Sequence, residues 1–583
     1  MAERTLGTLN AAPDRASPGP DVARPSQLDP HRWLALLVVL VAGFMDLLDV
    51  TIVNVAAPSI LRDLHASYSE LEWVITGYTL GFAAVLITGA RLGDIFGRKR
   101  IFLIGVAGFT AASALCGAAV SPAMLIGARF FEGAMSGLMV PQILAIIHVT
   151  FRSDERGKAF GMWGGVLGSA SAAGLVAGGL LVRWNLAGLG WRPIFLVNVP
   201  VGLLALVVGW VVVRDSCSQT SRRLDVVGMV LAAAGVLMLV YPLDEGRSLG
   251  WPAWIFALLA GGALVLVLFV AYEGRRTRHV GSPLVVMSLF RARAFSAGMA
   301  VWFIFWVAFG GFFIVWTLYM QVGLAWSPLR AGLTAATFAA GGAVGSGLAV
   351  QVLTPRLGRR VLMGGALVCA AGLALYAWVG YQYGPSVTSA QMVVPLLGAG
   401  FGFGLIVAPM IDTILTGVPT SYAGSASGTL STTQQLGVAF GVAVAGVLLF
   451  NLLATNSWRG VQSVTPMLRA ELTSVGITPA QREPIIDDFA LCVRQRSAES
   501  DPTQVPASCR SVPAPNPSEV RDLLGRDEAL ANAHNFARSF TVTLWCAVAI
   551  LGVVFLGLFA LPRRVRLRTF DLEVEEATAE TVT

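Results

Sequence analysis

From Trp33 onward the chain is a succession of apolar runs, most of them close to the roughly 20 residues that an α-helix needs to cross a bilayer. Only 13% of the residues are charged, whereas soluble domains carry about 25%, so too few polar side chains remain to cover a water-soluble particle. We therefore expect an all-α polytopic membrane protein. Fourteen transmembrane helices are predicted, at about 34–57, 71–90, 101–120, 123–149, 158–182, 193–213, 226–243, 252–272, 296–321, 329–352, 361–383, 390–417, 424–453 and 540–561.

The positive charges indicate which loops face the cytoplasm. Twenty-two lysines and arginines lie in alternate loops and in the C-terminal tail, against five in the opposite short loops: Arg62, Arg183, Arg192, Arg247 and Arg330. Because cytoplasmic loops are enriched in Lys and Arg, both termini are predicted to be cytoplasmic, as an even number of helices requires. The basic charge is thus assigned to topology, and no nucleic-acid partner is expected.

Three polar segments lie outside the predicted helices. Residues 1–32 are expected to form a disordered cytoplasmic tail, and 563–583 a second cytoplasmic tail. Residues 456–537 are polar and Pro-rich and are expected to form an extracytoplasmic loop. That loop holds Cys492 and Cys509, which either form a disulfide or stay reduced.

Charged side chains inside the predicted helices are the first candidates for function, because each costs at least about 2.5–3.5 kcal/mol on membrane-insertion scales. Asp46 and Asp49 are three residues apart and share a helix face, where mutual repulsion makes at least one a candidate proton carrier. The alternative is a carboxylate fixed permanently by a hydrogen bond or an ion pair. Arg129 and Glu132 are also three apart. They either neutralise each other or tune the proton affinity of the site.

A weaker candidate is a substrate cavity on the helix predicted at 296–321. An aromatic stripe runs along it at helical spacing, formed by Trp302, Trp306, Phe309, Phe313 and Trp316. Such a stripe could line a cavity for flat, lipophilic molecules, but aromatic side chains that face lipid or another helix are the commoner case. Asp412, in the helix predicted at 390–417, is a second weak candidate for this cavity.

The sequence gives no sign of an enzyme. The only two lysines, Lys99 and Lys158, do not fit a GxxxxGK[ST] phosphate-binding loop, and HExxH, CxxC and GxSxG are all absent. The five histidines are too far apart to suggest a local metal site. We expect no catalytic residue, no metal and no cofactor, with a proton gradient as the energy source.

The cytoplasmic loop after the second predicted helix carries a family motif. Residues 90–100 read A-R-L-G-D-I-F-G-R-K-R, which closely resembles G-x-L-x-D-x-x-G-R-[KR]-R of the major facilitator superfamily. A partial copy at 353–360 follows the tenth predicted helix and fits two six-helix halves related by an internal repeat. The resemblance implies a conformational gate made by Asp94, Gly97, Arg98 and Lys99.

Further motifs are similar to those of the fourteen-helix drug:proton antiporter branch. They are LDVTIVNVAAP at 48–58, WRPIFLVNVPVG at 191–202 and AGSASGTLSTTQQLG at 423–437, together with Arg129, Gly133 and Gly137, the position of an arginine linked to proton coupling. The resemblance covers about residues 33–455 and 538–565. It implies a six-helix half at 33–213, two linker helices at 214–273, helices 9–13 of the second half at 274–455 and a last helix at 538–562.

The chain also departs from that branch. Ala90 replaces the first Gly of the loop motif, and Glu132 replaces the usual Gln beside the fourth-helix arginine. The fifth-helix motif Gly-Pro-x-x-Gly-Gly keeps Gly174, Gly178 and Gly179 but lacks its proline, so close helix packing is expected without a proline kink.

The sequence as a whole predicts a proton-coupled secondary transporter that exports drugs, antibiotics or other amphipathic small molecules across the plasma (inner) membrane. Its expected partners are a lipophilic or cationic substrate, protons and the lipid bilayer, and a monomer is expected. One alternative is a transporter of the same fold that carries a lipid, a siderophore or a metabolite. A second is a transporter-like sensor that acts through residues 456–537.

Overall fold

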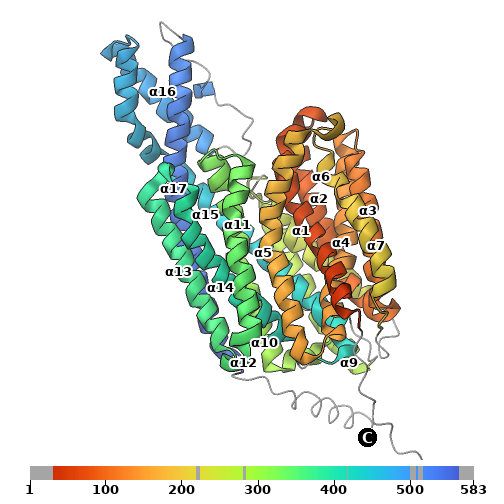
Figure 1. Ribbon diagram of the computed structural model, residues 1–583. Coiled ribbons are helices and arrows are strands. Elements are labelled where there is room, and N and C mark those ends of the chain that lie inside the picture. The colour runs from red at the N-terminus through yellow and green to blue at the C-terminus, as the bar shows by residue number, and fades with distance from the viewer. Residues whose placement is uncertain are drawn as a thin grey trace, which may run out of the picture.

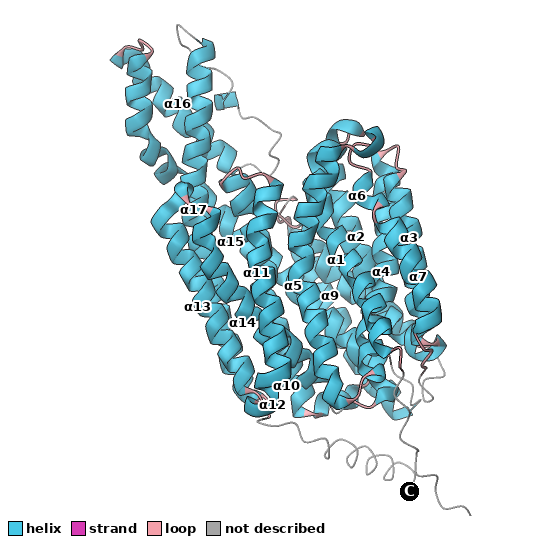
Figure 2. Cartoon of the chain, in the orientation of Figure 1, coloured by secondary structure: helices cyan, strands magenta, loops and turns pink. Residues whose placement is uncertain are grey.

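The computed structural model describes residues 30–217, 224–247, 249–279, 284–416, 418–498, 507–509 and 517–562. The expected tails at 1–32 and 563–583 lie outside these ranges, apart from residues 30–32. Over the described ranges the chain folds into helices and loops without a strand (Figure 2). Thirteen of the described helices are long and apolar enough to cross a membrane, which confirms the polytopic all-α class. A helix also occupies the remaining predicted span, at 158–182, but the total of fourteen crossings stays a prediction.

Helices α1 to α7 form the first of two bundles that stand side by side (Figure 1). Their bounds are Arg32–Asp63 (α1), Tyr68–Phe96 (α2), Arg98–Gly117 (α3), Pro122–Thr150 (α4), Ser153–Trp184 (α5), Pro193–Leu196 (α6) and Asn198–Val212 (α7). Glycines let α2 and α4 approach closely, since a Cβ on Gly81 or Gly133 would collide with the opposite backbone. This close pair places the polar side chains of α4 against α1 and α2.

The second bundle consists of the helices from α10 to α17, apart from α16. Their bounds are Arg293–Leu318 (α10), Pro328–Leu348 (α11), Thr354–Leu357 (α12), Arg360–Tyr383 (α13), Ser389–Leu415 (α14), Ala423–Ser474 (α15) and Pro517–Gly557 (α17). The two bundles meet where α5 packs on α11 and α14, and where α2 packs on α15. The two remaining long helices, α8 (Val226–Glu245) and α9 (Ala253–His279), pair with each other, and α8 contacts both α2 and α15.

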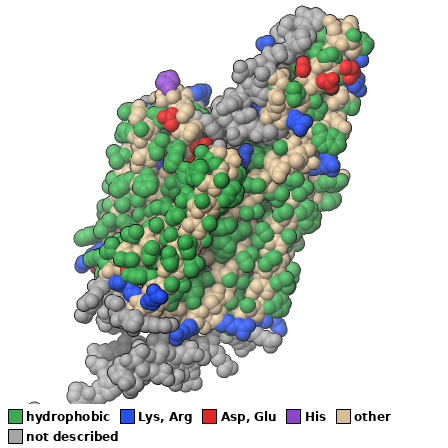
Figure 3. All heavy atoms as spheres, turned by 180° about the vertical axis from the view of Figure 1, so that it is seen from behind, with side chains coloured by type: hydrophobic (Ala, Val, Ile, Leu, Met, Phe, Trp, Pro, Cys, Tyr) green, Lys and Arg blue, Asp and Glu red, His purple; other side chains and the backbone are tan. Residues whose placement is uncertain are grey.

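The surface of the bundles matches a lipid environment. Hydrophobic side chains cover the flank seen in Figure 3. Lys and Arg side chains gather at one end of the bundles, opposite the end from which further helices project. On α7, the side chains of Trp210 and Val211 are 70% and 77% exposed. Such large apolar groups are stable in that position when lipid tails surround them.

The helix predicted at 193–213 is interrupted. The structure divides it into α6 and α7, with Val197 between them. Pro200 has no N–H to donate to the carbonyl four residues earlier, so the helical hydrogen-bond ladder is broken at this point. The break places Asn198 at the first position of α7, where its side chain reaches into the first bundle.

The segment 456–537 differs most from expectation, because it is largely helical where the sequence predicted a polar, Pro-rich loop. Helix α15 continues to Ser474, α16 spans Pro479–Ala498, and α17 begins at Pro517. We call the described part of residues 456–537, which projects beyond the bundles, the outer unit (Figure 1). Its own apolar core is formed by Val461, Val464, Leu468, Leu472, Ile477, Ile485, Ile486, Phe489, Val493, Val520, Leu523 and Ala531. These apolar residues recur at helical spacing, a signal obscured by the polar and proline residues between them.

Candidate functional site

A buried ionic cluster lies within the first bundle and joins α1 to α4. The guanidinium of Arg129 donates through Nη1 to the Asp49 carboxylate and to Glu132 Oε2, the latter at 2.8 Å. Its Nε donates to the Val74 carbonyl of α2 at 3.3 Å. Arg129, Asp49 and Glu132 are each at most 1% exposed. The structure therefore unites three of the four predicted proton-coupling residues around one guanidinium.

Asn198 and Ser113 extend this cluster, and the sequence alone did not point to them. Asn198, at the start of α7, donates to Asp49 Oδ1 at 3.1 Å and to the Ser113 hydroxyl of α3 at 3.0 Å. The Ser113 hydroxyl in turn donates to the Phe195 carbonyl. Asn198 belongs to the quoted motif at 191–202, so its place in that motif was the available signal. Helices α1, α3, α4 and α7 thus converge on Asp49.

Asp46 has a separate set of partners one helical turn away. Its carboxylate accepts hydrogen bonds from the Tyr78 hydroxyl of α2 and from the Ser136 hydroxyl of α4. The ring of Tyr78 also lies against the Arg129 guanidinium, with 4.3 Å between the guanidinium carbon and the ring centre. Tyr78 therefore stands between the two aspartates and links their surroundings.

A second polar contact joins the two bundles. Asp94, near the end of α2, pairs with Arg98 at 2.7 Å and accepts the backbone N–H groups of Gly424 at 3.1 Å and Ser425 at 3.0 Å. These N–H groups belong to the first turn of α15, where the helix dipole favours a negative charge. Asp94 is 1% exposed. A single carboxylate therefore ties α2 and α3 to α15.

The other predicted gating residues support this contact from within the first bundle. Gly97 has φ of +102°, in the region that favours glycine, and makes the turn from α2 into α3. That turn brings Arg98 back to Asp94, four residues before it. Lys99 donates to the Trp210 carbonyl of α7 and so holds the same bundle rather than crossing to the other.

The aromatic stripe on α10 is packed inside the second bundle. Trp302 and Phe309 are fully buried, and Trp306 and Trp316 are at most 5% exposed. Phe309 packs against Phe338 of α11 and edge-to-face against Phe403 of α14, with ring centres 6.2 and 4.7 Å apart. Phe313 contacts the same two rings. The stripe builds a bundle core in this conformation, so its role in a substrate cavity stays a prediction.

Asp412 is not brought to the ionic cluster. It lies half-buried near the end of α14, in the second bundle, and its backbone carbonyl accepts the Thr416 N–H at 2.7 Å.

The three predicted packing glycines of α5 contact two neighbouring helices. A Cβ on Gly174 would collide with Thr51 of α1, one on Gly178 would lie 2.9 Å from Ile52 of α1, and Gly179 faces Leu329 of α11.

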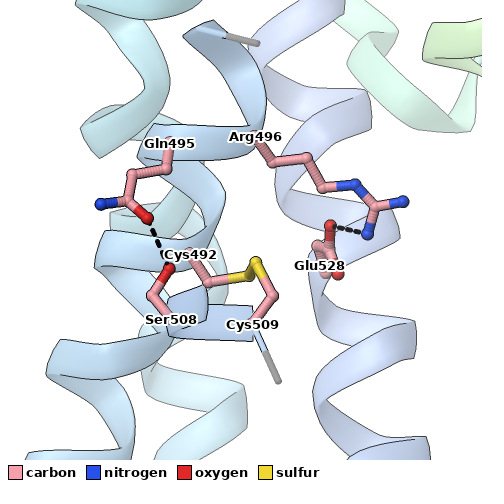
Figure 4. Close-up of a disulfide and its surroundings, with 6 residues drawn as sticks. All are labelled: Cys492, Gln495, Arg496, Ser508, Cys509 and Glu528. Carbon is pink, nitrogen blue, oxygen red and sulfur yellow. Dashed lines mark hydrogen bonds and ion pairs between the residues drawn. A yellow bond between two sulfur atoms is a disulfide. The ribbon is translucent and has the colours of Figure 1, made fainter. Parts of the chain in front are cut away.

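The outer unit carries the two cysteines as a pair. Cys492 of α16 is bonded to Cys509, with 4.9 Å between their Cα atoms (Figure 4). The Ser508 hydroxyl donates to Gln495 at 2.7 Å, beside the disulfide. The sequence alone allowed either a disulfide or two reduced cysteines here, and the structure has the disulfide.

Comparisons with known proteins agree with this architecture. A family model described as "Major Facilitator Superfamily" matches residues 39–442. A "Probable actinorhodin transporter" of Streptomyces coelicolor is 39% identical over 97% of this chain and 98% of its own length. "Puromycin resistance protein pur8" of Streptomyces alboniger is 37% identical over 78% and 88%, and "Multidrug resistance protein Stp" of Mycobacterium tuberculosis is 31% identical over 94% and 96%.

One solved structure supports the same fold at low sequence similarity. The human organic anion transporter MFSD10 (TETRAN) superposes with a TM-score of 0.52 and is 14% identical, covering 90% of this chain and 99% of that one.

Proposed function

The chain belongs to the Major Facilitator Superfamily, and we propose that it exports antibiotics, drugs or other amphipathic small molecules in exchange for protons. It is a multi-pass membrane protein. The relatives that it matches over most of their length are named for antibiotic transport and drug resistance. We place it in the plasma membrane as a monomer. Both termini are assigned to the cytoplasm, because the Lys and Arg side chains gather at the end of the bundles opposite the outer unit.

The observation that carries the proton step is the charge balance of the buried cluster. Asp49 and Glu132 share the single guanidinium of Arg129, so the cluster has one excess negative charge when both carboxylates are ionised. An uncompensated charge in a buried site is unfavourable. Binding of one proton restores neutrality, and loss of that proton restores the charge.

Protonation would also change how the helices are held. Asp49 receives hydrogen bonds from Arg129 of α4 and Asn198 of α7. Both contacts are strongest with an ionised acceptor, so a proton on Asp49 weakens the ties of α1 to these helices. At the other end of the first bundle, the Asp94 contact with α15 keeps the bundles together in the described conformation. The proposed cycle couples the proton at Asp49 to release of this contact.

The test is efflux by purified protein in liposomes with an imposed pH gradient. Puromycin serves as one substrate, and a lipophilic cation and a neutral aromatic compound as others. Asp49→Asn should abolish gradient-driven transport while leaving exchange of labelled substrate without a gradient. Asp63→Asn, the same change at the outer end of the same helix, is the matched control and should keep both activities. A correctly folded Asp49→Asn protein with unchanged gradient-driven transport would falsify the proton assignment.

A further inference from the structure

A large cavity lies outside the ionic cluster. It has a volume of about 670 Å³ and is lined by residues of α8, α10 and α15 together with residues of the outer unit. A cavity of a few hundred to about 1,000 Å³ is large enough for a drug-sized molecule. The residues that line it therefore determine which kind of ligand it can bind.

The apolar part of the wall is extensive and includes aromatic rings. Val322, in the π-helical turn Tyr319–Gly323 that follows α10, contributes to it, as do Phe450 of α15, Phe536 of α17 and Trp251 from the turn between α8 and α9. Such a wall suits a bulky apolar body, and aromatic faces also attract cations. Its polar part then decides which charge the ligand carries.

Five charged residues line the same cavity. Arg496 and Glu528 form an ion pair at 2.7 Å, and the guanidinium of Arg247 stands 3.1 Å from the ring centre of Phe450. Glu72 and Arg247 take part in other interactions as well. With Asp244, these residues give three carboxylates against two guanidinium groups, an excess of one negative charge.

Asp244 is the residue that supplies this excess. It lies half-buried in the last turn of α8. No described residue donates a hydrogen bond to its carboxylate or forms an ion pair with it. Its neighbour Glu245 is already engaged, because it accepts the Thr76 hydroxyl at 2.8 Å. A carboxylate next to apolar walls gains most from a cationic partner.

We propose that this cavity is an outer binding site for amphipathic organic cations, with Asp244 as the residue that selects their charge. The site rests on the proposed export function and would hold the cargo on its way out. The linker helix α8 and the outer unit then have a role beyond joining the bundles, since each supplies part of one ligand site.

The first test measures binding to the purified protein in lipid nanodiscs without any gradient. Tetraphenylphosphonium is the cationic probe, and triphenylphosphine oxide is a neutral probe of similar shape. Asp244→Asn should weaken binding of the cation by about tenfold or more, as expected for loss of a nearby opposite charge, and should leave the neutral probe unaffected. Asp522→Asn, an exposed position of the outer unit that does not line the cavity, is the matched control and should bind both probes as the parent does.

A second variant tests the cavity itself and does not depend on charge. Gly446 of α15 lines the cavity, and a Cβ added there would meet no atom within 4 Å. Gly446→Leu should therefore fill part of the cavity without displacing a neighbour and reduce binding of both probes. Gly552→Leu on α17 also adds a side chain in open space, away from the cavity, and should have no effect.

Unchanged affinity for tetraphenylphosphonium in both Asp244→Asn and Gly446→Leu would overturn the proposal. That result would leave the export function intact if the pH gradient still drives transport of other substrates by the parent protein. Absence of all transport by the parent would instead refute the export function, whatever the binding data show.

Discussion

Asp94 of α2 accepts the backbone N–H of Ser425 in α15 at 3.0 Å, and so joins the first bundle to the start of a helix in the second. The same carboxylate pairs with Arg98 at 2.7 Å. Because the acceptor is charged, buried and placed at a helix N-terminus, this contact is stronger than an ordinary hydrogen bond. It is the clearest structural candidate for a latch between the bundles.

Replacing Asp94 with Asn should open this latch. The variant removes the negative charge beside Arg98 and the N-terminus of α15, and removing one partner of a buried ion pair costs about 3–5 kcal/mol. We expect the amides of Gly424 and Ser425 to exchange with deuterium at least tenfold faster, a change of about 1.4 kcal/mol. Transport should fall in parallel.

A matched control lies beside the turn from α2 into α3. Arg100 and Asp215 form an ion pair at 3.1 Å, but their side chains are 73% and 41% exposed. Exposed pairs of this kind contribute little, so Asp215→Asn should leave both exchange and transport unchanged. Equal exchange at Gly424 in Asp94→Asn and in the parent would show that Asp94 does not hold the bundles together.

Arg129 provides a second prediction, because among the described residues it is the one cation that pairs with Asp49 and Glu132. Arg129→Gln leaves two buried carboxylates uncompensated and should destabilise the protein by about 3–5 kcal/mol. Thermal unfolding in detergent, followed by tryptophan fluorescence, measures this loss.

Neutralising the whole cluster separates stability from coupling. A triple variant with Arg129→Gln, Asp49→Asn and Glu132→Gln buries no charge at the site, so it should recover most of the lost thermal stability. It should still fail to couple efflux to a pH gradient. Recovery of gradient-driven efflux would rule out this cluster as the proton site.

The length of the apolar runs was enough to predict the helical class and the position of the helices within the bundles. It was insufficient at Val197 and in the outer unit, since the helix break depends on one missing N–H at Pro200 and the outer core on a few apolar residues among polar ones. The family resemblance is likewise confirmed by the match over residues 39–442.

For the site, local spacing identified residues but could not assign their partners. Asp46 and Asp49 were predicted to share one helix face, yet hydroxyl groups bind Asp46 while Arg129 and Asn198 bind Asp49. These partners come from four other positions far along the chain. Only the packing of α2, α4 and α7 around α1 determines which of them reaches which aspartate.

Asp63, the last residue of α1, gives a prediction for pH. Hydrogen bonds from Arg192 at 2.7 Å and from Trp191 at 2.9 Å hold the pKa of Asp63 below its ordinary value. A lowered pKa in the folded state stabilises the protein above the unfolded-state pKa of about 3.9, and this contribution is lost as the pH falls through the folded-state pKa.

Asp63→Asn should therefore lower the unfolding temperature at pH 7, and the difference from the parent should shrink as the pH falls below about 4. The effect should be small because the Asp63 side chain is 49% exposed. Unfolding temperatures of both proteins across this pH range provide the measurement. A difference that grows on acidification would contradict the assigned sign.

The disulfide of the outer unit gives the last prediction. Cys492 and Cys509 are 17 residues apart, and closing a loop of about this length stabilises a fold by roughly 3 kcal/mol. The Arg496–Glu528 ion pair, at 2.7 Å, also ties α16 to α17, but its partly exposed side chains contribute less (Figure 4). Cys492→Ser with Cys509→Ser should therefore speed limited proteolysis within the outer unit, while the bundles stay resistant.

Reductant separates this disulfide from other thiol effects. It should accelerate proteolysis of the parent to the rate of the double variant, and it should not change the double variant. Cys217→Ser removes an exposed free thiol and should behave like the parent.

If the cavity beside the outer unit binds cargo, the double variant should also bind tetraphenylphosphonium more weakly. Arg496 and Glu528 line the cavity and also form the contact between α16 and α17. Rapid proteolysis with unchanged cation affinity would assign the disulfide to the stability of the outer unit alone.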